Sequence, residues 1–290
     1  TRRLLRVLEQ DGIRQRRFAE RYARRLRPTL YSPNARAAQT DLERLAKSEL
    51  AISIVLPPGG DALGWASLAH LASPRQAGPF VVFDALTSDF DQEQWDDPEQ
   101  DPLGMAETGT WVLVNPQALD AERSQILTRA VARHRTYRVI DGAPSMGIIL
   151  AWHRVPNFEL DERPDLTDLL QLFPSPNRVV VPSLSDRSED LRAIIYDRAA
   201  RLGAALRGEP LGVDVAALAV MLEHDWPLND LELDVTLYAL VLATEGDVIT
   251  TEALDRIAFG KRQLSSPQPT ASPSRKRPRL MPPSIRPKAR

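Results

Sequence analysis

Short apolar runs alternate with amphipathic segments along most of the chain. Apolar runs of three to six residues that are bounded by Gly, Pro or polar residues predict buried strands. Such runs occupy 51–56, 79–83, 110–114, 137–140, 148–152 and 179–181. Apolar residues spaced three or four positions apart predict helices at 37–48, 63–71 and 120–133, whereas the acidic stretch 87–102 predicts a loop. Strands separated by helices predict a parallel sheet with helices on both faces.

The C-terminal third of the body shows helical periodicity throughout. The predicted helices are 189–207, 214–224, 229–244 and 251–258. We therefore expect an α/β subdomain followed by an α-helical lid. The expected organisation is a basic N-terminal helix or linker at 1–28, the α/β subdomain at 29–188, the lid at 189–260 and a disordered tail at 261–290.

The two ends of the chain differ in charge from the body. The 290 residues have a formal net charge of −2, but residues 1–28 carry 10 Arg against 3 acids and residues 261–290 carry 9 Lys or Arg and no acid. The ends therefore have charges of +7 and +9, and the body between them has −18. Such an asymmetry bears on the partners of a protein rather than on its fold.

The N-terminal segment predicts a basic amphipathic helix that ends at Pro28. Phe18, Tyr22 and Leu26 belong to a partial apolar stripe, and Arg residues cover the remaining positions. A helix of this kind contacts nucleic acid, a membrane surface or a partner helix. The favoured alternative is a linker helix that packs on the acidic body.

The C-terminal tail has the composition of a disordered segment. It contains seven Pro and five Ser and has too little apolar surface to offset its ordering entropy. One basic cluster in it has the charge to dock on nucleic acid or on an acidic protein surface, and the equal alternative is a solubilising tail. The cluster consists of Arg275, Lys276, Arg277 and Arg279.

The composition excludes several classes of protein. The absence of Cys excludes a disulfide framework and a thiolate metal site, and it fits a reducing compartment. No apolar run is long enough to span a bilayer, and the Arg-rich N-terminal segment has no apolar h-region, so no secretory signal is visible. The acidic run that begins at Asp89 has Gln94 and Gln100 where a calcium-binding EF-hand loop needs Gly and Glu. We therefore expect a cytoplasmic protein with no metal site and no membrane span.

Six short strings resemble those of one family in order and in spacing. They are S-P at 32–33, H-x-x-S-x-R…P-F at 70–80, R-P-D-L at 163–166, V-P-S-L-S-D-R-S-E-D-L at 181–191, D-W-P-L-N-D-L-E-L at 225–233 and G-D-V-I-T at 246–250. This set resembles the AAA+ domain of the sigma-54 activators, the bacterial enhancer-binding proteins. The resemblance covers about 30–260 and implies a P-loop-type, three-layer α/β fold with a helical lid. It also implies a bacterial source.

The resemblance places a phosphate-binding loop after the first strand, where this chain departs from the family. The family's loop reads G-E-x-G-x-G-K-E, and its amides and its Lys hold phosphate groups. Here Ala62 stands at the Lys position, and Asp61 puts a negative charge where a phosphate would lie. Only Gly59 keeps its place among the loop glycines. A small anion-binding nest at Gly59 and Gly60 is a weaker alternative.

Further positions that the resemblance assigns to catalysis are also changed. Val114 and Asn115 replace the acidic pair after the third strand, His153 replaces the Asn of the next strand end, and Leu231 replaces the lid Arg. Arg163 is kept where the family reaches across a subunit boundary, but the second Arg of that motif is Leu169. The G-A-F-T-G-A loop and the Fis-like DNA-binding helices of the family are missing.

These losses predict a catalytically inactive AAA+ module, a pseudo-ATPase that does not bind ATP. It would act as a protein-interaction or regulatory scaffold, with a protein partner or a homo- or hetero-oligomer in which Arg163 stabilises the boundary. One alternative is a transcription regulator that binds nucleic acid through its basic ends. The other is a working sigma-54 activator ATPase, against which the missing Lys and carboxylates argue.

Overall fold

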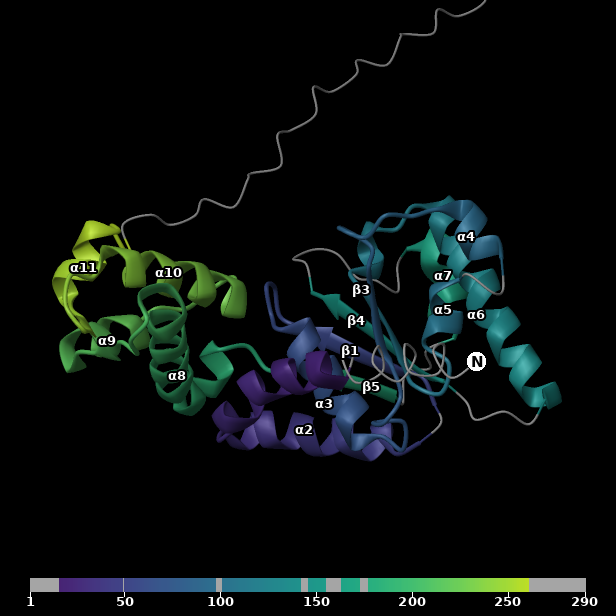
Figure 1. Cartoon of the computed structure of the whole chain (residues 1–290), viewed down its shortest axis with the longest axis horizontal. Helices are drawn as coiled ribbons and strands as arrows, with labels where there is room; N and C mark the ends of the chain where they lie inside the picture. Colours follow the sequence, from purple (N-terminus) through teal and green to yellow (C-terminus); the bar gives the residue numbers. More distant parts are fainter. Residues whose placement is uncertain are drawn as a thin grey trace, which may run out of the picture.

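A five-stranded parallel sheet forms the centre of the first part of the chain (Figure 1). The computed structural model describes residues 16–48, 50–97, 101–141, 146–154, 163–172 and 177–260. The strands lie in the order β2-β3-β4-β1-β5, and every pairing is parallel. Their bounds are β1 Ile52–Leu56, β2 Phe80–Asp84, β3 Thr110–Val114, β4 Gly147–His153 and β5 Arg178–Val180.

Helices cover both faces of this sheet, as the alternating pattern predicted. One face carries α2 (Pro33–Ala46) and α3 (Ala62–Ala72). The other face carries α4 (Gln92–Asp96), α5 (Pro102–Met105), α6 (Ala121–Asp141) and α7 (Thr167–Leu170). The α/β prediction with three layers is confirmed.

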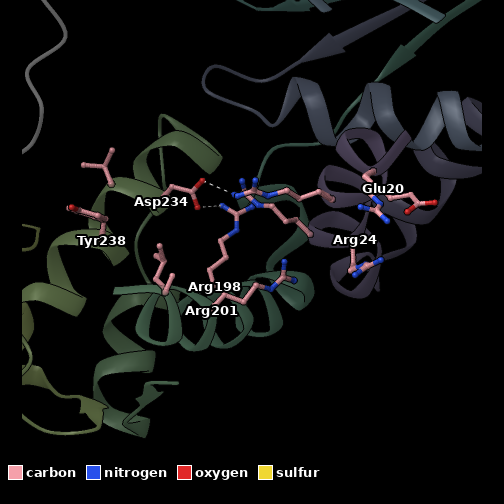
Figure 2. Close-up of a pocket in the computed structure, with 12 residues that line it drawn as sticks. Glu20, Arg24, Arg198, Arg201, Asp234 and Tyr238 are labelled. Atoms are coloured by element: carbon pink, nitrogen blue, oxygen red, sulfur yellow. Dashed lines mark hydrogen bonds and ion pairs between the residues drawn. The ribbon is translucent and has the colours of Figure 1, made fainter. Parts of the chain in front are cut away.

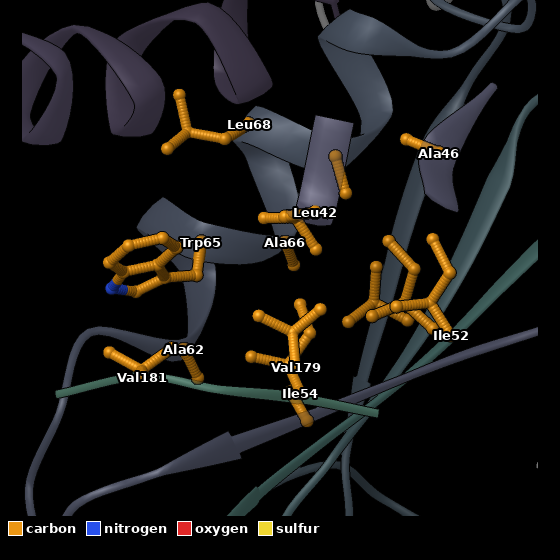
Figure 3. Packing of buried hydrophobic residues seen from close by; sticks show 14 of the residues in the cluster. Leu42, Ala46, Ile52, Ile54, Ala62, Trp65, Ala66, Leu68, Val179 and Val181 are labelled. Carbon is orange, nitrogen blue, oxygen red and sulfur yellow. The ribbon is translucent and has the colours of Figure 1, made fainter. Parts of the chain in front are cut away.

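Successive residues of the central strands pack into the two opposite layers. In β1, Ile54 is buried against α2 and α3 (Figure 3). Leu56 is buried in the same layer, whereas Val55 is buried in the layer of α6. Trp65 of α3 is fully buried in the first layer, and Trp111 of β3 is fully buried in the second. Because both faces are covered, the strands are apolar throughout rather than alternating, which is typical of parallel sheets.

The lid follows the sheet and has a hydrophobic core of its own. It contains α8 (Ser188–Arg207), α9 (Val215–Leu222), α10 (Asn229–Ala243) and α11 (Thr251–Arg256). It also contains a short parallel pair, β6 (Gly212–Val213) and β7 (Val248–Ile249). Trp226 is buried in this core, and its indole N–H donates to the Met221 carbonyl at 3.0 Å.

Three details of the predicted elements are wrong. Residues 137–140 form no strand but continue α6, because a short apolar run does not distinguish a strand from part of a helix. The stretch 87–102 is not entirely loop, since Asp91 caps the short helix α4 by accepting a hydrogen bond from the Glu93 amide. The lid is not purely helical, because β6 and β7 pair within it.

The basic N-terminal helix is described over residues 16–26 and packs on the first layer of the sheet. Ala19, Ala23 and Leu26 are buried there, as the linker-helix interpretation predicted. The helix passes into a 3-10 turn at Arg27–Thr29, which contains Pro28. The basic cluster at 275–279 lies outside the described residues. Within those residues, no helix is long and apolar enough to cross a membrane.

Candidate functional site

The loop after β1 forms a tight turn that leads directly into α3. The Gly60 amide donates to the Pro57 carbonyl at 3.0 Å, and Gly59 has a left-handed φ of +70°. Asp61 caps the helix, because its carboxylate accepts a hydrogen bond from the Gly64 amide at 2.9 Å. Ala62 is the first residue of α3 and is buried in the hydrophobic core. The predicted loop residues therefore lie together at the carboxyl end of the central strand β1.

The first turn of lid helix α10 packs directly on this loop. The Leu231 amide donates to the Gly59 carbonyl at 2.9 Å, and the Asn229 side chain donates to the Pro58 carbonyl at 3.0 Å. A Cβ atom at Gly59 would lie 2.1 Å from the Leu228 carbonyl oxygen. Gly59 is thus required both by its backbone angle and by the approach of the lid.

Asp230 supplies a buried carboxylate at the same place. It forms ion pairs with Arg198 and, at 3.6 Å, with Arg187, and the backbone amide of Asp61 also hydrogen-bonds it. Burial raises the pKa of Asp230, but the two guanidinium groups outweigh this effect and hold its pKa below the usual value. A carboxylate of the protein itself therefore lies at a loop amide, where the family resemblance places phosphate.

Asp61 lies in an environment that disfavours its charge. Burial, followed by the nearby Asp230 carboxylate, raises its pKa. One of its carboxylate oxygens caps α3, and the other is buried without a hydrogen-bond partner. Asp61 therefore adds to the unfavourable surroundings for a further anion at this loop.

A chain of hydrogen bonds joins the ends of three strands to the loop. Asn115, which has a left-handed φ of 55°, donates from its side chain to an Asp84 carboxylate oxygen at 2.9 Å. The His153 ring lies between the Asn115 side-chain oxygen, at 3.0 Å, and the Gly60 carbonyl, at 2.9 Å. The structure thus brings Gly60, Asn115 and His153 together, while Val114 is buried in the sheet core.

Arg163 is bound within its own subunit. Its guanidinium forms a fork on the Asp165 carboxylate and donates to the carbonyls of Gln117, at 3.2 Å, and Leu119, at 3.0 Å. It therefore ties the start of the 3-10 turn η4 (Pro164–Leu166) to the turn that follows β3. Its role across a subunit boundary stays a prediction.

The remaining predicted positions contribute backbone or apolar packing. Leu231 is 56% exposed, and its amide donates a hydrogen bond to the loop. Leu169 is buried in the layer of α6. Within the described residues, no group of three or more His, Asp or Glu side chains is arranged to hold a metal ion.

Sequence reasoning missed the Asp230 cluster. Asp230 stands inside the D-W-P-L-N-D-L-E-L string, but Arg198 precedes it by 32 positions and Arg187 by 43. No local spacing connects these residues. The sequence signal for this cluster was Asp230 itself, an acidic residue next to Leu231, which stands at the lid Arg position.

The sheet order, the helices on both faces and the helical lid together define an α/β P-loop NTPase-like fold of the AAA+ type. NtrX from Brucella abortus in complex with ATP superposes with a TM-score of 0.61 and is 23% identical, over 77% of this chain and 55% of NtrX. The NtrX complex with ADP has the same TM-score and identity, over 77% and 54% of the two chains. This likeness shows the fold alone.

Comparison of sequences gives a shorter match. No family model matches the chain. Over 122 residues, the chain is 32% identical to the Sinorhizobium fredii protein named "Putative transcriptional regulatory protein y4pA". The match covers 42% of this chain and 20% of that protein. The chain thus spans about half of NtrX and matches a fifth of y4pA.

Proposed function

We propose that this chain is a catalytically inactive AAA+ module that regulates transcription through protein contacts. One observation carries the proposal: the loop at the nucleotide position is closed by the protein's own groups. Three successive loop carbonyls, those of Pro58, Gly59 and Gly60, accept hydrogen bonds from Asn229, Leu231 and His153. A phosphate-binding loop instead directs its amides toward the anion.

The charges at the loop support the same proposal. Phosphoryl transfer requires that the charge developing on the phosphate oxygens be neutralised. Among the described residues, Arg187, Arg198 and Arg25 are cations near the loop. Arg187 and Arg198 already pair with the Asp230 carboxylate, and Arg25 pairs with Asp234. Because Ala62 stands at the Lys position, the loop itself supplies no cation to neutralise a phosphate. A nucleotide would need to displace a buried ion pair and bring its own negative charge beside Asp61.

The regulatory part of the proposal is supported by the comparisons. The sequence match is to a protein whose name states transcriptional regulation, and the fold is that of NtrX. A module that keeps the fold but lacks the means of phosphoryl transfer retains its surfaces. Contacts with a protein partner, or with copies of itself through the region of Arg163, are the functions left to it.

Binding of a fluorescent ATP analogue, measured together with phosphate release, tests the proposal. Brucella abortus NtrX, whose structure holds ATP, is the positive control, and circular dichroism verifies that both proteins are folded. We expect neither saturable binding nor Mg²⁺-dependent phosphate release by this chain under conditions in which NtrX binds. Micromolar binding with Mg²⁺-dependent turnover would refute the proposal.

Nucleic-acid binding through the basic ends is the second candidate. It is favoured by the charges of +7 and +9 on the two ends and by the regulatory name of y4pA. It predicts binding of duplex DNA that weakens steeply with salt and is lost when 261–290 is deleted. Anisotropy titrations of the full and shortened chains measure this. Equal binding by both chains, or by neither, removes the tail from any such role.

A further inference from the structure

A wide groove separates the N-terminal helix from the lid, and two of its lining residues, Arg25 and Arg198, lie close enough to the loop after β1 to act on Asp61. Its volume is about 880 Å³, and helix 16–26 forms one wall while α8 and α10 form the other (Figure 2). In Figure 2, Glu20 and Arg24 extend from the first wall, and Arg201 and Tyr238 extend from the second. Six of the lining residues are arginines, and two are acidic.

Ion pairs within the groove connect its two walls. Arg25 of the N-terminal helix donates to Asp234 of α10 at 3.0 Å, and Arg198 of α8 donates to the other oxygen of Asp234 at 2.9 Å. Arg201 pairs with Asp197 on its own helix. These contacts neutralise three of the six arginines and fix the N-terminal helix against the lid.

The other three arginines are Arg17, Arg21 and Arg24. None forms an ion pair or a side-chain hydrogen bond in the part of the chain that the structure describes, and all three are exposed. They recur at i, i+4 and i+7, so they form a stripe about 10 Å long on one face of the helix. Like charges at this spacing destabilise a helix. An anionic partner would remove that repulsion.

The opposite wall presents an apolar stripe. Leu231, Val235, Tyr238 and Leu242 of α10 follow a spacing of i, i+4, i+7 and i+11, and each side chain is between 48% and 63% exposed. Val235 and Tyr238 belong both to this stripe and to the groove lining. A continuous exposed apolar stripe on a surface helix indicates a contact surface rather than scattered surface residues.

We propose that this groove binds an amphipathic helix of a partner protein, with carboxylates facing Arg17, Arg21 and Arg24 and apolar side chains facing α10. A helix fits because it repeats at the same spacing as both stripes. The charge argues against the chain's own ends, since residues 1–15, which precede the groove wall, and residues 261–290 have net charges of +2 and +9. Nucleic acid would satisfy the arginines but leave the apolar stripe uncovered. The inference rests on the proposed function, because it names the partner chemistry of a protein-contact module.

A designed peptide provides the probe. The labelled helical peptide carries Glu at i, i+4 and i+7 and Leu along the adjacent stripe, and a scrambled peptide of identical composition accompanies it. Fluorescence anisotropy with the full chain should show binding of the patterned peptide and about tenfold weaker binding of the scrambled one.

Variants identify the surface that the peptide contacts. The triple substitution R17Q/R21Q/R24Q and, separately, V235Q/L242Q should each weaken peptide binding by about tenfold or more. All these side chains are exposed, so the fold is retained, and thermal melts verify this. R44Q and R192Q remove exposed arginines of α2 and α8 outside the groove and should leave binding unchanged.

Three results overturn the proposal. They are equal binding of both peptides, no binding of either, and saturable binding of single-stranded or duplex DNA that depends on Arg17, Arg21 and Arg24. The ATP assay separates this failure from that of the proposed function. Nucleotide turnover refutes the inactive module whether or not the peptide binds, and absent peptide binding without turnover refutes only the groove.

Discussion

Closure of the lid on the loop makes Gly59→Ala the most informative single substitution. Alanine at a left-handed φ of +70° costs about 1–2 kcal/mol. The added methyl group would also lie 2.1 Å from the Leu228 carbonyl oxygen, so loop and lid must separate. Separation breaks the hydrogen bonds made by Asn229 and Leu231, each of which contributes about 1 kcal/mol. The expected loss of unfolding free energy is therefore about 3–4 kcal/mol.

Two other glycines of the same chain separate these contributions. Gly208 also has a left-handed φ, of +85°, but its Cβ would meet no atom within 4 Å, so Gly208→Ala carries only the backbone cost. Gly246 has open space and no left-handed φ, so Gly246→Ala sets the baseline. Urea unfolding followed by Trp fluorescence gives the three free energies, and hydrogen exchange at the Leu231 amide reports the lid contact directly. If Gly59→Ala costs no more than Gly208→Ala, the lid does not close on the loop.

Three further predictions concern groups outside the loop. Burial, and secondarily Arg16, lowers the pKa of His70 to about 4, whereas the unfolded chain binds this proton near 6.5. The unfolded state therefore binds more protons than the folded state between these two pKa values. The free energy of unfolding should fall by about 3 kcal/mol as pH drops from 6.5 to 4. Urea unfolding at stepped pH measures this fall, and His70→Asn should abolish it. Asp101→Asn should lower the free energy of unfolding by about 2–3 kcal/mol, because the buried Asp101 carboxylate accepts a hydrogen bond from Arg133 at 2.9 Å. A thermal melt should show a lower midpoint, and an unchanged midpoint contradicts this. Arg163→Gln should lower the free energy of unfolding by about 1–2 kcal/mol in the same assay, because it removes the hydrogen bonds to the Asp165 carboxylate and to the two turn carbonyls. Sedimentation of this variant also shows whether Arg163 contributes to an oligomer.

The fold could be predicted where a sequence pattern is compatible with only one kind of secondary structure. The runs at 51–56 and 110–114 are apolar because both faces of a parallel sheet are covered, and they correspond to β1 and β3. The run at 137–140 also contains β-branched and aromatic residues but extends α6. Nothing in four residues distinguishes the two outcomes, because the register of the whole helix decides which side chains it buries.

The site could be predicted in part for a similar reason. Its position followed from topology, since the loop after β1 and the ends of β3 and β4 meet at one edge of a parallel sheet. Hence Gly60, Asn115 and His153 lie in one hydrogen-bonded chain. The partners of these residues were beyond reach, because the pairing of Asp230 with Arg198 depends on how the lid packs, and no local period encodes that packing.

The closed loop and the open groove have a common physical origin in α10. The first turn of this helix places Asp230 and Leu231 on the loop, and there its polar groups are satisfied inside the chain. Farther along the same helix, Val235 and Tyr238 line the groove opposite Arg17, Arg21 and Arg24, which form no ion pair within the described residues. The first turn of α10 therefore directs its polar groups to the loop, whereas its middle leaves apolar side chains exposed in the groove. Selection for binding would act on the second surface, which is why we place the partner there and not at the loop after β1.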